Sequence, residues 1–262
     1  MVFRKKFGVV LSSLFLLLFW TSVASAQQVD MNKDDIKNPN YKNVVGNHTA
    51  NGACEYSGSM MLQPNENARM AEVVSQDPSS CAAVLKEGTP KEIKPVKDNR
   101  LGVKSSSTSS MGYTGKSMGA DPESSGYLHY WITDPVNMSL NSVTDYITWW
   151  WDGYNVVGNF YGSDYRTWLS DEWPYSGWNE LTHCSGCYSF NVWWDGWGGA
   201  ANVSTTDLFN INNSLWGFNW VFYNPNRVEG GPQGQLWCYF YVTYGGDSSA
   251  LMWPNVQLIR TM

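Results

Sequence analysis

Residues 235–244 read QLWCYFYVTY, and this stretch decides the fold. Its side chains alternate between two sets, with Leu236, Cys238, Phe240 and Val242 in one set and Trp237, Tyr239, Tyr241 and Thr243 in the other. Successive side chains of a strand point to opposite faces, so a period of two indicates a β-strand with an apolar face.

The same period recurs in several other stretches. Each of the following sets is expected to share one face of a strand: Leu128, Tyr130 and Ile132; Val143, Ile147, Trp149 and Trp151; and Val256 and Leu258. In 216–223, Trp216, Phe218, Trp220 and Phe222 share one face, and Gly217, Asn219 and Tyr223 lie on the other. Gly, Asn, Asp and Ser separate these runs, and no strand–helix alternation disturbs them. We therefore predict a mainly β protein, an antiparallel two-sheet β-sandwich of the jelly-roll-like type.

Composition narrows the class of protein further. The chain has 262 residues and a formal net charge of -6, with 43% hydrophobic and 15% charged residues. The apolar content excludes a disordered protein, and Ala, Glu, Lys and Leu do not dominate as they do in a coiled coil. An acidic chain is also a poor match for nucleic acid, whose phosphates select Lys and Arg.

The N-terminus has the features of a secretory signal peptide. Arg4, Lys5 and Lys6 precede an apolar run from Phe7 to Trp20, and Ala24-Ser25-Ala26 has the small-x-small form that signal peptidase recognises. The apolar run is shorter than a membrane span requires. We expect cleavage near Ala26 and a secreted, extracellular mature chain with no membrane span.

A change in composition divides the mature chain. Lysines end at Lys116, whereas every Trp after Trp20 lies at or beyond Trp131. The boundary falls in a Ser/Gly-rich stretch from Ser105 to about Gly126, which is typical of a flexible connection. We therefore predict a signal peptide over 1–26, a small disulfide-tied N-terminal segment over 27–104, a linker over 105–125 and a Trp-rich β-sandwich domain over 126–262.

The N-terminal segment is expected to be a small α+β unit. Strands are predicted at 60–62 and 68–74. Asp77-Pro78 has the pattern of a helix start and Gly88 that of a stop, which predicts a short helix between them. Because the segment is small for an independent core, packing against the larger part is the alternative.

A WWDG motif occurs twice, at 150–153 and 193–196. Asp-Gly between alternating runs predicts a β-hairpin with Trp151 facing Tyr154 in the first copy. The functional interpretation adds that the hairpin tips display aromatic rings and carboxylates together, a combination suited to sugars. Between the copies lies a long aromatic stretch that contains Trp168, Trp173 and Trp178.

These features favour a secreted, non-enzymatic protein that binds glycan or cell-wall polysaccharide. Aromatic rings offer a flat apolar surface to the C–H faces of sugars, and carboxylates accept hydrogen bonds from hydroxyl groups. The candidate ligand-binding residues are Trp150, Asp152, Trp168, Trp173, Trp178, Trp194 and Asp195. A structural envelope protein with no small ligand is one alternative.

A polysaccharide-active glycoside hydrolase is the other alternative. Such an enzyme needs paired carboxylates about 5–10 Å apart. Asp171, Glu172 and Glu180 lie among tryptophans and are the candidates. No HExxH, GxSxG, P-loop or nucleotide-binding glycine motif is present. No cofactor is expected; calcium is the alternative for an acid-rich exported chain, although no loop has EF-hand spacing.

The positions of the five cysteines in the chain indicate which of them form disulfides. Cys54 and Cys81 alone precede the linker, which predicts a bridge between them. We predict a second, local bridge between Cys184 and Cys187 and a buried free thiol at Cys238, with Cys187–Cys238 as the alternative. Zinc held by these thiols and His183 is disfavoured because exported thiols oxidise.

Overall fold

The computed structural model describes residues 41–77, 79–90, 103–111, 122–170, 177–183 and 200–261. All of them belong to one unit, Asn40–Met262. The strands are β1 (Tyr41–Val45), β2 (Asn47–His48), β3 (Cys54–Leu62), β4 (Ala68–Asp77), β5 (Ala82–Gly88), β6 (Val103–Met111), β7 (Glu123–Thr133), β8 (Ser139–Trp151), β9 (Val156–Leu169), β10 (Asn179–His183), β11 (Ala201–Asn213), β12 (Gly217–Gly230), β13 (Leu236–Gly246) and β14 (Trp253–Thr261), with a 3-10 turn, η2, at Ser249–Leu251.

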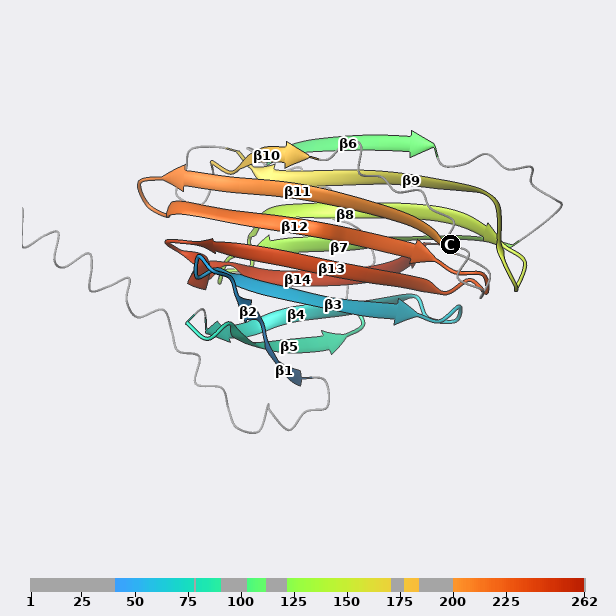
Figure 1. Cartoon of the computed structure of the whole chain (residues 1–262), viewed down its shortest axis with the longest axis horizontal. Helices are drawn as coiled ribbons and strands as arrows, with labels where there is room; N and C mark the ends of the chain where they lie inside the picture. Colours follow the sequence, from blue (N-terminus) through green and yellow to red (C-terminus); the bar gives the residue numbers. More distant parts are fainter. Residues whose placement is uncertain are drawn as a thin grey trace, which may run out of the picture. The chain divides into compact units, whose positions relative to one another are not determined.

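Two antiparallel sheets form a sandwich, as predicted. Sheet A has the order β1-β5-β4-β14-β7-β8-β9-β6, and sheet B has the order β10-β11-β12-β13-β3-β2. The sheets are stacked as two layers whose strands run in similar directions, and β11 and β12 pack across β8 (Figure 1). No helical segment of the described residues has the length and apolar character that a membrane crossing requires.

The expected helix after Asp77 is wrong. Oδ1 of Asp77 accepts hydrogen bonds from the backbone N–H of Ser79 at 2.9 Å and from its hydroxyl at 2.6 Å, and these contacts form a turn. Residues 82–88 then form β5, which pairs with β4 on one side and β1 on the other. Asp77 caps backbone amides as expected, but pairing with distant strands decides the conformation that follows.

The Ser-rich stretch also differs from the expectation of a connection. Residues 103–111 form β6, an edge strand that pairs with β9 from Val103↔Leu169 to Met111↔Tyr161. Backbone hydrogen bonds need no large side chain, so serines suffice at a sheet edge. Strands that precede and strands that follow this stretch share both sheets, which places β3, β4 and β5 within the sandwich.

The predicted alternation defines the core. Leu128 and Ile132 on β7 and Val143 and Trp149 on β8 are all fully buried between the sheets. On β13, Leu236, Cys238 and Val242 point inward, again as predicted. On β12 the two faces divide as predicted, but the more aromatic face points outward, because Asn219, Val221 and Tyr223 are the buried set.

The first WWDG copy, together with Trp149 that precedes it, forms a structural contact between two turns. Nε1 of Trp149 donates a 3.0 Å hydrogen bond to the carbonyl of Gly231 in the β12–β13 turn. The backbone N–H of Gly153 donates to the carbonyl of Pro232 at 3.0 Å. The motif therefore joins the β8–β9 end of sheet A to the β12–β13 end of sheet B.

The predicted Trp151–Tyr154 cross-strand pair is wrong. Trp151 pairs with Val156, and Tyr154 is 82% exposed at the tip of the turn. Oδ1 of Asp152 accepts hydrogen bonds from the backbone N–H groups of Tyr154 and Asn155, which opens a four-residue loop in place of a two-residue turn. The second copy, 193–196, lies outside the described residues.

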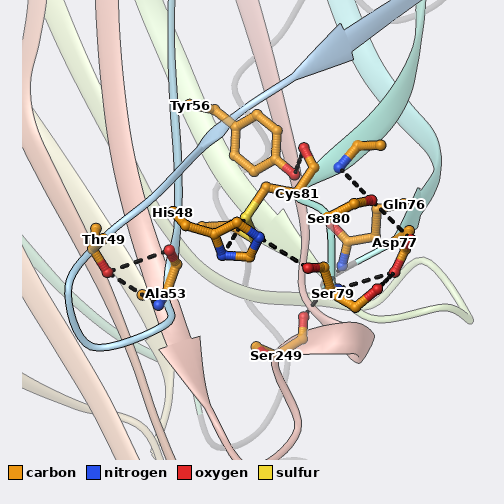
Figure 2. The surroundings of a disulfide bond; sticks show 12 residues. His48, Thr49, Ala53, Tyr56, Gln76, Asp77, Ser79, Ser80, Cys81 and Ser249 are labelled. Atoms are coloured by element: carbon orange, nitrogen blue, oxygen red, sulfur yellow. Dashed lines mark hydrogen bonds between the residues drawn. A yellow bond between two sulfur atoms is a disulfide. The ribbon is translucent and has the colours of Figure 1, made fainter.

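The predicted Cys54–Cys81 disulfide is present and buried, and Cys238 is a buried free cysteine as predicted. Figure 2 shows the disulfide surrounded by hydrogen bonds: Tyr56 donates to the carbonyl of Cys81 at 2.8 Å, and Nε2 of His48 lies 2.9 Å from the carbonyl of Ser79. The bridge ties β3 of sheet B to the start of β5 in sheet A. Cys184 and Cys187 lie outside the described residues.

Candidate functional site

The outward side of β12 and β13 carries a row of aromatic rings that we call the aromatic face. It consists of Phe218, Trp220, Phe222, Trp237, Tyr239 and Tyr241. Phe218 and Tyr239 are each 46% exposed, and the other rings are part-exposed. Their alternate neighbours fill the core, so the strand period obliges these rings to face outward.

Two rings of the aromatic face lie over glycines. A Cβ on Gly245, the cross-strand partner of Trp220, would lie 3.3 Å from the Trp220 indole, and a Cβ on Gly231 would lie 2.3 Å from the Trp237 indole. The rings therefore occupy the space that a side chain would take there. This packing holds both indoles in place and leaves part of each ring open to solvent.

The surroundings of the aromatic face are small and polar. Ser57 and Ser59 of β3 lie directly opposite Tyr241 and Tyr239. Because serine side chains are short, the neighbouring tyrosine rings stand clear of the sheet. The carboxylate of Glu55 accepts a hydrogen bond from the Tyr241 hydroxyl, and this contact raises the pKa of that phenol.

A single guanidinium accompanies the described part of the aromatic face. Cζ of Arg227 lies 5.7 Å from the centroid of the Tyr239 ring, within the range of a cation–π contact. The same guanidinium forms an ion pair with Glu229. Its positive charge is therefore compensated, and the aromatic face has no net positive charge to attract an anion.

A groove of about 710 Å³ runs along the border of the aromatic face. It is lined by β3, β4, β5 and β13, and both Trp237 and Tyr239 contribute to its rim. The groove exists because sheet B ends with the two-residue β2 beside β3, whereas sheet A continues beyond β4 with β5 and β1. Arg69 and Glu66, an ion pair at 2.7 Å, add polar groups to its wall.

The structure does not gather the predicted ligand-binding residues into one surface. Trp150 is part-buried and packs edge-on against Tyr161, with 5.7 Å between the ring centroids. Asp152 is exposed in its turn. Trp168 packs on Phe209, and Trp178 is 1% exposed, so both fill the interior. Trp173, Trp194 and Asp195 lie outside the described residues.

Of the predicted acids, Asp171 and Glu172 lie outside the described residues, and Glu180 belongs to a buried polar network. This network contains Asp145, Asp164, Arg166, Glu180, His183 and Asp207. Nη1 of Arg166 lies 2.6 Å from Oε1 of Glu180, and Nδ1 of His183 lies 2.8 Å from Oδ1 of Asp207. Glu180 is thus held by an ion pair between the sheets.

Burial controls the protonation of this network. Burial raises the pKa of Asp145 well above its ordinary value, and the nearby carboxylates of Asp207 and Asp164 raise it further. Burial also raises the pKa of Glu180, although the charge of Arg166 opposes this shift. The network therefore favours neutral forms for part of its acids.

The network does not fit a metal ion. Ligand atoms of Glu180, His183 and Asp207 lie within 4.8 Å of one another, which is close enough for a shared cation. However, Nη1 of Arg166 lies 2.6 Å from Glu180 and 3.7 Å from Asp207, so the guanidinium already supplies the positive charge between them. A metal ion there would meet a fixed cation at contact distance.

Two signals in the sequence could have revealed these sites. In 235–244 and 216–223 both faces of the strand are apolar or aromatic, so one of them has to face solvent. Asp145 lies on the apolar face between Val143 and Ile147, which marks it as a buried acid.

Comparisons with protein-family models, with curated proteins and with solved structures find no match to this chain.

Proposed function

We propose that this protein is an exported, non-enzymatic glycan-binding protein whose contact surface is the aromatic face. The observation that carries the proposal is the row of outward-facing rings on β12 and β13, of which Phe218 and Tyr239 are exposed and the others part-exposed. A patch of apolar rings with a polar rim is typical of an interaction site. Sugar rings present C–H-rich faces that pack on such rings, while their hydroxyls bond to polar neighbours such as Glu55 and Arg227.

The charge of the site supports an uncharged polysaccharide as the ligand. Arg227 is paired with Glu229, and Glu55 lies beside Tyr241, so an acidic glycan would meet a surface without free positive charge. Rings in successive alternate positions on one strand lie about 6.5–7 Å apart, which suits a repeating polymer better than a single sugar. The buried disulfide is compatible with export to an oxidising compartment.

Binding is tested by co-sedimentation of the purified mature chain with insoluble cellulose, chitin, xylan and mannan. We expect retention on at least one polymer, and a loss of roughly 3–10-fold in affinity for Tyr239→Ala and for Phe218→Ala. Tyr154→Ala is the matched control, because Tyr154 is more exposed than either ring but lies at the β8–β9 turn.

Three outcomes would contradict the proposal. These are no retention on any polymer, equal losses for Tyr154→Ala and Tyr239→Ala, or release of soluble reducing ends from the polymer that is bound. The last result would favour the hydrolase interpretation, and Glu180→Gln would then show whether Glu180 takes part in it.

A further inference from the structure

A threonine, an aspartate and an asparagine meet in the interior of the sandwich without contact with solvent. Thr205 on β11 and Asn226 on β12 are directly opposite each other in the strand register. Both point inward toward Asp145 on β8 of the other sheet. All three residues are 0% exposed.

The hydrogen bonds of this triad arrange a nucleophile, a proton carrier and an amide. The hydroxyl of Thr205 donates to Oδ1 of Asp145 at 2.9 Å and approaches Oδ2 at 3.1 Å. Nδ2 of Asn226 donates to Oδ2 of the same carboxyl group at 3.2 Å. The carboxyl group therefore bridges the hydroxyl and the amide.

From this geometry we infer that Thr205 and Asn226 form an intramolecular ester cross-link, with Asp145 carrying the proton between them. In this reaction Oγ1 of Thr205 attacks Cγ of Asn226, and a C–O bond forms. Oδ1 of Asp145 takes the hydroxyl proton while Oδ2 delivers a proton to Nδ2. The C–N bond breaks, one ammonia leaves, and the aspartic acid is restored.

The spacing of the two strands allows the attack. Directly opposite Cβ atoms of an antiparallel pair lie about 4.5–5.5 Å apart. Oγ1 of Thr205 and Cγ of Asn226 are each one bond beyond their Cβ atoms, so the spacing of this pair is compatible with the contact of about 3–3.5 Å that a near-attack geometry needs.

The environment favours the reaction in two ways. Burial raises the pKa of Asp145, and the nearby Asp207 and Asp164 raise it further, which favours the protonated form that can deliver a proton to the leaving nitrogen. Among the described residues, Oδ1 of Asn226 is a buried oxygen with no hydrogen-bond partner. Ester formation removes this unsatisfied amide and leaves a carbonyl that is a weaker acceptor. Exclusion of water then protects the ester from hydrolysis.

Intact mass spectrometry of the reduced, full mature chain tests the inference. We expect a mass lower than the sequence mass by one ammonia, either on purification or after prolonged incubation at neutral pH. Chymotrypsin cleaves at the aromatic residues between positions 205 and 226, so the peptides that contain Thr205 and Asn226 should stay joined. An unchanged mass in both samples, or separate peptides, would overturn the inference.

Variants separate this ester from a succinimide at Asn226, which also releases ammonia. Thr205→Val and Asp145→Asn should show the full sequence mass, whereas Thr205→Ser should keep the ammonia loss because it retains the hydroxyl. Persistent loss in Thr205→Val would contradict the ester. The wild-type peptide map decides the question even if a variant fails to fold, and near-ultraviolet circular dichroism identifies such a variant.

Discussion

Nη1 of Arg166 on β9 lies 2.6 Å from Oε1 of Glu180 on β10, and this ion pair joins sheet A to sheet B. The same side chain is only 3% exposed and also lies 3.1 Å from Oδ2 of Asp164. The interior of the sandwich therefore contains a guanidinium that compensates several acids at once. Its removal would leave those acids without a counter-charge in a place that water does not reach.

Arg166→Leu should therefore be strongly destabilising. We expect the free energy of unfolding to fall by about 3–5 kcal/mol, because breaking a buried ion pair leaves uncompensated charge. Urea denaturation measures this loss. Arg69→Leu is the control, since the exposed Arg69–Glu66 pair should contribute no more than about 1 kcal/mol. An equal loss in the free energy of unfolding for the two variants would contradict this expectation, because the buried ion pair would then contribute no more to stability than the exposed one.

Stability should also fall as pH rises above about 4. The pKa values of Asp145 and Glu180 are raised by burial, so the folded state binds more protons than the unfolded state between the two sets of pKa values. Stability is then highest below the unfolded pKa and is lost as pH rises through the folded one. Urea denaturation at pH 5, 6.5 and 8 measures the slope.

Asp145→Asn should make this slope shallower, because Asn keeps the shape and loses the titration. The slope, and not the stability at one pH, is the readout. Asp152→Asn is the matched control: backbone hydrogen bonds lower the pKa of this exposed acid, so its effect lies at more acidic pH and has the opposite sign. A slope that is the same in Asp145→Asn and in the wild type would contradict the assignment.

The strands were predictable because their signal is local. The alternation in 128–132, 143–151 and 235–244 identifies strands whose inward faces the structure confirms. Which face of β12 points into the core was harder to predict, because the aromatic Phe218 and Trp220 are more typical of a core than the polar Asn219. Asn219 is buried because its amide bonds to the carbonyl of Trp216 and accepts from the N–H of Ser248. Trp216 lies in the turn before β12, and Ser248 lies in the segment that follows β13.

The candidate sites depend on longer-range relations. The aromatic face can be recognised only once it is known which side of β13 meets sheet A. The triad joins Asp145 on β8 to Thr205 and Asn226 on the consecutive strands β11 and β12, which lie 60 and 81 residues further along the chain. At Asn224 and Pro225 the register shifts, so inward residues change from odd positions to even ones and Asn226 turns inward. A period of two read through this point would place Asn226 on the wrong face.

Gly230→Ala should destabilise the contact between the two turns. A Cβ at this position would lie 2.2 Å from the Trp149 indole, which is fully buried and bonded to Gly231. We expect a loss of roughly 1–3 kcal/mol from overpacking. Gly88→Ala is the control because nothing lies within 4 Å of its Cβ position, so its effect should stay within about 0.5 kcal/mol. Thermal denaturation of both variants compares them, and similar losses would show that Trp149 yields to the added methyl.

Cys238 should be inert in the folded protein although its thiol is free. Burial raises the pKa of this thiol to about 12, and the side chain is 0% exposed, so neither the reactive thiolate nor access for a reagent is provided. A chromogenic disulfide reagent at pH 8 should therefore react equally with the native wild type and native Cys238→Ala. In denaturant, the wild type should react with one more thiol equivalent than the variant. A faster reaction of the native wild type would mean that Cys238 reaches solvent through an opening of β13.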